Sequence, residues 1–329
     1  MEIADLRPLS LGELLDRAFT IYRGNFWVLA GTMALPAALG IPLTFFVLRF
    51  DTTLFANPVA PVAPSPQAIL GFAALYLVFL FVTALVYALV AGAMTFAVSE
   101  AYLGRKATIA ASYKSLRGKC WRLIGVALNV LLRLMGIAIL VSLVLGGVGL
   151  VLLGATAVAT RAVAAGTPPV VLGVVFAVMF LLLYLLILAT MVYLSLRYAV
   201  AIPALALENL GVLASIRRSV RLTKGRRGHV FVAMLLAFII SMVGSMVFYV
   251  PFYIPSMIMM ARDHAVPAWL SLLSAVFAAL GSSVTSPIFM IVLVLCYYDT
   301  RVRKEAFDLQ FMMASLDNSP AAAGTVPSA

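Results

Sequence analysis

In the stretch from residue 211 to 229, apolar and basic residues occupy different positions around a predicted helix. This stretch lies between two long apolar runs. The apolar residues of this stretch recur at helical spacing: Val212, Leu213, Ile216 and Val220. Basic residues fill other positions, which is typical of an amphipathic helix lying on a membrane surface. The Lys224-Gly225 pair that follows predicts a turn leading the chain into the bilayer.

Two more stretches show related patterns. Ser10 and Glu13 fit a capping box, in which each side chain satisfies a free backbone N–H at a helix start. After them, apolar residues again recur at helical spacing: Leu11, Leu14, Leu15, Ala18, Phe19 and Tyr22. The stretch 100–122 has a weaker apolar stripe and is rich in Lys and Arg. Both stretches predict interfacial helices that lead into a membrane span.

Six apolar runs are long enough to cross a bilayer, which takes about 20 helical residues. The predicted spans are residues 26–48, 68–98, 121–160, 170–196, 230–260 and 269–298. The third contains 38 almost continuously apolar residues, and we expect Gly146, Gly147 and Gly149 to break it. The predicted fold class is therefore all-α, a polytopic membrane protein with six transmembrane helices.

Composition supports this prediction and narrows the partners. The chain is 64% hydrophobic and 11% charged, which is too apolar for a soluble domain. Its net charge of +11 is spread beside the apolar runs. We therefore expect anionic lipid headgroups as partners, and no nucleic acid. Cys120 and Cys296 are not expected to form a disulfide, and no spacing predicts a metal or a cofactor.

The distribution of basic residues predicts the orientation. Nineteen of the 23 Lys and Arg residues fall at the N-terminus, in 99–122, in 197–229 or after the last span. The positive-inside rule places these segments, and both termini, in the cytoplasm. The expected location is the plasma (inner) membrane of a prokaryote.

A threefold internal repeat is a further hypothesis. Shifting the sequence by 107 positions pairs Gly104 with Gly211 and Gly118 with Gly225, and a shift of 94 pairs Trp27 with Trp121. One membrane domain, 1–316, would then contain repeat units at about 9–100, 104–200 and 211–300, followed by a disordered tail at 317–329. The alternative is that any interfacial helix before a span has such residues.

The same segments resemble a family of uncharacterised six-span bacterial and archaeal proteins. That family is named after the membrane domain found in some glycerophosphoryl diester phosphodiesterases. The segments that carry the resemblance are Leu9–Phe19, Tyr22-Arg23, Asn25–Trp27, Ile216–Ser219, Leu222–Gly225 and Tyr297–Lys304. The resemblance implies membrane architecture rather than chemistry, because the phosphodiesterase activity belongs to a separate catalytic domain that we do not expect here.

The sequence contains no convergent set of catalytic residues, so we expect no enzyme and no catalytic site. The basic residues expected at lipid headgroups are Arg17, Arg23, Lys114, Arg117, Arg217, Arg218, Arg221 and Lys224. A second candidate site is intramembrane and polar. It consists of Asn129 and Arg133, with Glu100 or Glu208 as counter-ion. Either Arg133 lines a cavity in the membrane, or it extends to the inner interface.

The sequence is compatible with two functions. The first is a non-enzymatic membrane protein that organises lipids or assists partner membrane proteins through its basic interfacial helices. The alternative is a transporter or lipid-handling permease with a polar site near Asn129 and Arg133. A membrane-embedded enzyme ranks below both. Protein partners and oligomeric state do not follow from the sequence.

Overall fold

The computed structural model describes residues 9–44, 66–162, 169–263 and 266–305, and its regular structure in these ranges is helical throughout. The predicted all-α class is confirmed. The helices, with their bounds, are α1 (Leu11–Gly24), α2 (Phe26–Ala38), α4 (Pro66–Tyr102), α5 (Ile109–Lys114), α6 (Cys120–Ala162), α7 (Pro169–Tyr198), α8 (Ala201–Glu208), α9 (Val212–Thr223), α10 (Arg227–Asp263) and α11 (Ala268–Glu305).

Six helical segments in these ranges are long and apolar enough to cross a membrane, as predicted. The predicted break in the third span is wrong, because α6 continues through Gly146, Gly147 and Gly149. A glycine costs a helix only about 1 kcal/mol relative to alanine, and the leucine and valine residues around it sustain the helix. Between α7 and α9, outside the predicted spans, lies the short helix α8.

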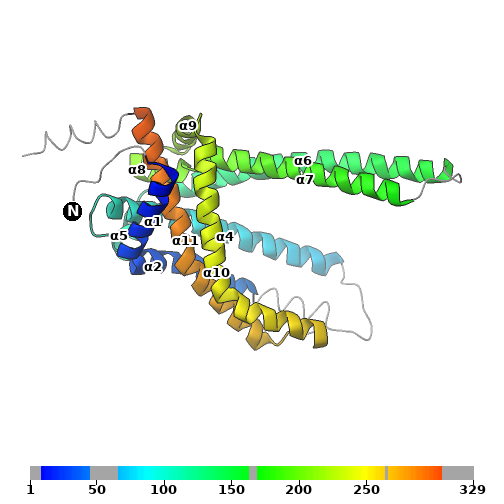
Figure 1. Ribbon diagram of the computed structural model, residues 1–329, viewed down its shortest axis with the longest axis horizontal. Helices are drawn as coiled ribbons and strands as arrows, with labels where there is room; N and C mark the ends of the chain where they lie inside the picture. Colours follow the sequence, from blue (N-terminus) through cyan, green and yellow to red (C-terminus); the bar gives the residue numbers. More distant parts are fainter. Residues whose placement is uncertain (1–8, 45–65, 163–168, 264–265, 306–329) are drawn as a thin grey trace, which may run out of the picture.

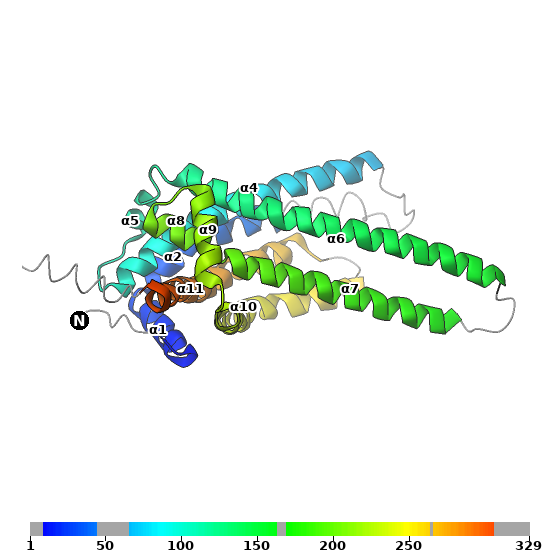
Figure 2. The ribbon, with the colours of Figure 1, turned by 90° about the horizontal axis from the view of Figure 1, so that it is seen from above.

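The short helices α1, α5, α8 and α9 gather at one end of the molecule, on the left in Figure 1. We call it the basic end, since the segments rich in Lys and Arg lie there. Three pairs of long helical segments extend from it: α2, whose candidate span runs to Thr44, with α4; α6 with α7; and α10 with α11. Figure 2 shows the α6–α7 pair projecting farthest. Each long helix contacts the next one in the chain, and α11 contacts α2, so the contacts form a closed ring.

Local sequence signals explain how the short helices begin and end. The predicted capping box is confirmed, because Ser10 Oγ accepts from Glu13 N and the Glu13 side chain accepts from Ser10 N. Gly118 precedes α6 and Gly225 precedes α10, with φ of +76° and +83°. Only glycine adopts such angles readily, so these two residues make the tight turns into the long helices.

The core is centred on α11. Every residue from Ile291 to Thr300 is buried, so this part of the helix is enclosed on all sides. Side chains from α1, α2, α4 and α10 pack against it in one hydrophobic cluster. The polar residues that follow in α11 are thereby brought within reach of several other helices.

Candidate functional site: a polar latch and an apolar cavity

The last two turns of α11 bind segments from across the chain, and we call residues 297–305 the α11 latch. Tyr297 Oη donates to Glu208 of α8 at 2.7 Å. Tyr298 Oη lies 2.7 Å from Ser99 Oγ of α4. Lys304 Nζ donates to the carbonyls of Arg221 and Lys224, at 2.6 Å each. Lys304 thus satisfies carbonyls left free at the end of α9.

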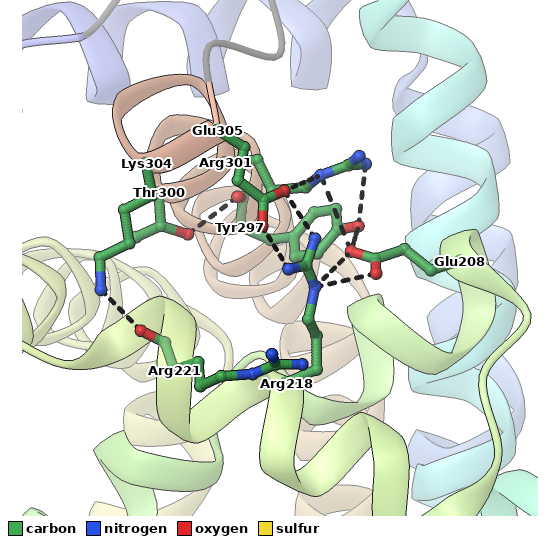
Figure 3. Close-up of polar contacts among 8 residues, drawn as sticks. All are labelled: Glu208, Arg218, Arg221, Tyr297, Thr300, Arg301, Lys304 and Glu305. Atoms are coloured by element: carbon green, nitrogen blue, oxygen red, sulfur yellow. Dashed lines mark hydrogen bonds and ion pairs between the residues drawn. The ribbon is translucent and has the colours of Figure 1, made fainter.

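Arg218 of α9 lies at the centre of the latch (Figure 3). Its Nε donates to Glu208 Oε2 at 2.9 Å, while its Nη1 and Nη2 donate to the two carboxylate oxygens of Glu305. Only 16% of the Arg218 side chain is exposed. The hydrogen bond to Glu305 is the main reason that its pKa is raised. Planar arginine suits this arrangement, because one guanidinium can bind two carboxylates at once.

A second part of the latch holds the start of the described chain. Asp299, with 1% of its side chain exposed, accepts a hydrogen bond from Leu9 N at 2.9 Å. Arg303 donates from Nε to Asp299 Oδ1 at 2.8 Å and from Nη2 to the Leu9 carbonyl at 2.7 Å. The two bonds to Leu9 join residues 290 and 294 positions apart in sequence. The latch therefore fastens α1, α8 and α9 to α11.

An apolar cavity of about 730 Å³ lies between α4, α10 and α11. Its walls are mostly aliphatic and aromatic, and the lining side chains include no carboxylate, Lys, Arg or His. Serine and threonine hydroxyls line one side. Most of them donate to backbone carbonyls of their own helix, and Ser241 Oγ donates to Thr285 O at 3.0 Å. The cavity therefore suits an apolar occupant.

A smaller pocket of about 380 Å³ lies over α9, between the latch and the surface. Arg217, Arg218 and Arg221 line it together with Glu208. Arg217 and Arg221 are exposed, whereas Arg218 is turned inward. Two arginines are thus available to an anion at this surface.

The other predicted interfacial residues are distributed around the basic end. Arg17 lies over the Tyr102 ring, 4.9 Å from its centre. The remaining four side chains belong to residues that are exposed, at or beyond the ends of short helices: Arg23, Lys114, Arg117 and Lys224.

The structure separates the residues of the predicted intramembrane site. Glu208 lies with Arg218 and Tyr297, and Glu100 lies 3.4 Å from Arg105, so neither is placed as the counter-ion of Arg133. Arg218 itself was predicted at lipid headgroups, and the structure instead places it inside the latch. Its two carboxylate partners are Glu208 of α8, ten positions away, and Glu305 of α11, 87 positions away.

Arg133 and Asn129 lie on α6 but do not line the cavity. The residue that α6 contributes to the cavity wall is Ala127. Arg133 is exposed and donates to Tyr198 Oη at 3.4 Å. Asn129 Oδ1 is buried without a hydrogen-bond partner in the described structure.

Sequence reasoning missed the role of the latch and the cavity. The segment Tyr297–Lys304 was noted only as a family feature, although its dense alternation of polar and charged residues at a span end was a usable signal. Ser241 and Thr285 are hydroxyl residues within apolar spans, and the sequence around them does not distinguish a cavity wall from ordinary helix packing.

Helices α8, α9 and α11, which meet at Arg218, all lie in the second half of the chain, and this part of the chain matches a known family. Residues 170–317 match the family described as the membrane domain of glycerophosphoryl diester phosphodiesterase. The resemblance is confirmed over this range, which includes the latch and α9. The N-terminal segments that carry the resemblance lie outside it. No curated protein and no solved structure matches the chain. The glycerophosphoryl diester phosphodiesterase membrane-domain family and the six apolar helices indicate an integral membrane protein.

Proposed function

We propose that this protein is a non-enzymatic membrane protein that binds membrane lipid and organises it around its basic end. One observation carries the proposal, namely the cavity between α4, α10 and α11. Its volume of about 730 Å³ falls within the range of about 300–1,000 Å³ that is typical of small-ligand sites.

The chemistry of the lining favours an acyl chain as the occupant. Met33, Phe289, Met290 and Leu293 offer apolar contacts, and methionine adapts its shape to flexible ligands. The hydroxyls beside them already donate to carbonyls, so an apolar group entering the cavity leaves few donors unsatisfied.

The basic end provides the second part of the proposal. We propose that it lies in the cytoplasm, together with both termini, in the inner membrane of a prokaryote. Exposed Arg217, Arg221 and Lys224 on and beside α9 would then face anionic headgroups, each contributing roughly 1 kcal/mol near the surface. The protein would act as an anchor for lipids, and assistance to partner membrane proteins is a further part of this proposal.

Lipid retention by the purified protein tests the cavity. The full chain is extracted in mild detergent, and the bound phospholipid is measured by native mass spectrometry. Ala84 lines the cavity on α4, and the indole of Ala84→Trp should occupy part of it and sharply reduce retention. Ala74 is exposed on the same helix, and Ala74→Trp should retain the lipid. Equal retention by both variants, or no lipid in the natural protein, would refute the proposal.

A permease with a polar site at Asn129 and Arg133 is the second candidate. The buried and unpartnered Asn129 Oδ1 favours it, since such an atom normally binds something. Replacing Asn129 with Leu separates the two candidates. A permease would lose transport of its cargo, measured as lipid transfer between the leaflets of vesicles, while a lipid-organising protein would keep its bound lipid.

We also propose that the three pairs of long helices are three copies of one unit. The ring of contacts supports this, because it brings α4 to α6, α7 to α10 and α11 to α2 in the same cyclic order. The shared left-handed turns at Gly118 and Gly225 support it for the second and third units. The first unit departs from the pattern, since Gly24 is the last residue of α1 and has no such angle.

A further inference from the structure

Three arginines from three long helices gather around two tyrosine rings of α7. The guanidinium carbons of Arg133 and Arg197 lie 5.7 and 5.9 Å from the centre of the Tyr198 ring. The guanidinium carbon of Arg227 lies 4.7 Å from the centre of the Tyr193 ring, and its Nη1 donates to Tyr193 Oη at 2.7 Å. Tyr193 and Arg197 are one helical turn apart and share one face of α7, and Arg197 shares the Tyr198 ring with Arg133.

These arginines have no carboxylate partner among the residues that the structure describes. A guanidinium has five N–H donors. Within the described ranges, side-chain hydrogen bonds engage Arg133 with Tyr198 and Arg227 with Tyr193, and none engages Arg197. Arg218 in the latch offers the contrast, because two carboxylates neutralise it. Three positive charges therefore lie here without a carboxylate, Arg133 exposed and Arg197 and Arg227 partly buried, and the Nε donors of the latter two are buried without a partner in the described part of the chain.

The position of the cluster along the helices fits the phosphate layer of a membrane. Arg197 is in the last turn of α7 and Arg227 is the first residue of α10. On α6, the turns before Arg133 are covered by short helices: Val212 of α9 packs on Gly125, and Lys119 Nζ donates to Ala206 O of α8 at 2.8 Å. From Arg133 to Ala162, α6 is about 45 Å long, which exceeds the hydrocarbon thickness of about 30 Å.

We propose that Arg133, Arg197 and Arg227 form a binding site for the phosphate of an anionic membrane lipid. Arginine binds phosphate oxygens through parallel N–H donors, and tyrosine is favoured where an apolar and a wet region meet. Figure 1 shows α6 and α7 running side by side from the region where α10 begins. The site goes beyond the lipid cavity, because none of the three arginines lines that cavity.

A charge-matched pair of variants tests the site. One carries Arg133→Gln, Arg197→Gln and Arg227→Gln. The control carries Arg105→Gln, Lys106→Gln and Arg262→Gln, three exposed residues outside the predicted headgroup contacts. Both are reconstituted in nanodiscs of phosphatidylcholine with a minor fraction of phosphatidylglycerol, and the lipids retained after release are counted by native mass spectrometry. Ala84→Trp serves as a second control, since it blocks only the cavity.

The preference for phosphatidylglycerol should fall about fivefold for each arginine removed. It should stay nearly unchanged in the control and in Ala84→Trp. Arg133→Gln alone should also weaken it with no change in unfolding, because Arg133 is exposed. Equal losses in the two triple variants would overturn the site by showing only general attraction. Displacement of phosphatidylglycerol by inorganic phosphate would overturn the assignment to a lipid.

Discussion

At the scale of single residues, Arg218 of α9 connects its own helix to two others, α8 and α11. Its guanidinium joins the end of α8 to the last residue of α11, through Glu208 and Glu305. The two carboxylates are only 16% and 27% exposed. Each therefore depends on its protein partner rather than on water for charge compensation.

Replacing Arg218 with Met should destabilise the protein by about 2 kcal/mol, because two shielded carboxylates lose their closest cation and keep Arg301, at 3.7 and 3.5 Å. Unfolding by SDS in mixed micelles, followed by circular dichroism, measures the change. Arg217→Met is the matched control. The Arg217 side chain is next to Arg218 in sequence but exposed, so its replacement should leave the free energy of unfolding almost unchanged. Similar effects of both substitutions would show that the latch does not hold the helices together.

Gly225 is a second residue whose role is local and testable. Its φ of +83° lies in the left-handed region, where a side chain costs roughly 1–2 kcal/mol. Gly225→Ala should therefore destabilise the protein by that amount in the same unfolding assay. Gly228→Ala should be neutral or slightly stabilising, because Gly228 lies in α10 with open space around its Cβ position. The reverse order would argue against a tight turn at Gly225.

At the scale of helices, close packing in the α10–α11 pair depends on two small residues. A Cβ on Gly281 would lie 2.9 Å from Phe248 Cβ, and a Cβ on Gly244 would lie 2.9 Å from Thr285 Cγ2. Small residues at such positions allow membrane helices to approach closely. The pair forms one wall of the cavity, so its spacing also sets the shape of the proposed lipid site.

Gly281→Val should force α10 and α11 apart at a cost of about 1–3 kcal/mol and should reduce lipid retention. Gly136→Val is the matched control, because Gly136 lies in α6 with nothing near its Cβ position. Both variants add the same β-branched residue to a long helix. If the control lost as much stability and lipid as Gly281→Val, helix propensity rather than packing would be responsible.

The number and order of the spans were predictable, because each is a local run of apolar residues. The capping box at Ser10 and Glu13 was predictable for the same reason. The latch was not, since Leu9 meets Asp299 and Glu208 meets Tyr297 only when distant helices pack. The three glycines of α6 wrongly predicted a break in the helix. Their cost in helix stability is small for a helix of 43 residues, so α6 continues through them.

At the scale of the whole molecule, orientation relative to the membrane determines which lipids the basic end meets. Six spans require both termini on one side, and the basic segments favour the cytoplasm. Green fluorescent protein fused after the last residue should therefore fluoresce in bacterial cells, while alkaline phosphatase at the same place should be inactive. Fusions after Asp263, between α10 and α11, should give the opposite result. An active C-terminal phosphatase would reverse the proposed orientation.

The central claim is that the cavity holds a lipid chain, and site-specific photo-crosslinking tests it most directly. Met290 lines the cavity, whereas Val247 is 71% exposed on the outer surface of α10. A benzophenone side chain at each position is activated in protein purified in detergent, and the adducts are identified by mass spectrometry. Crosslinks to phospholipid at position 290 but not at 247 are the predicted result. Detergent or no adduct at position 290 would contradict the account.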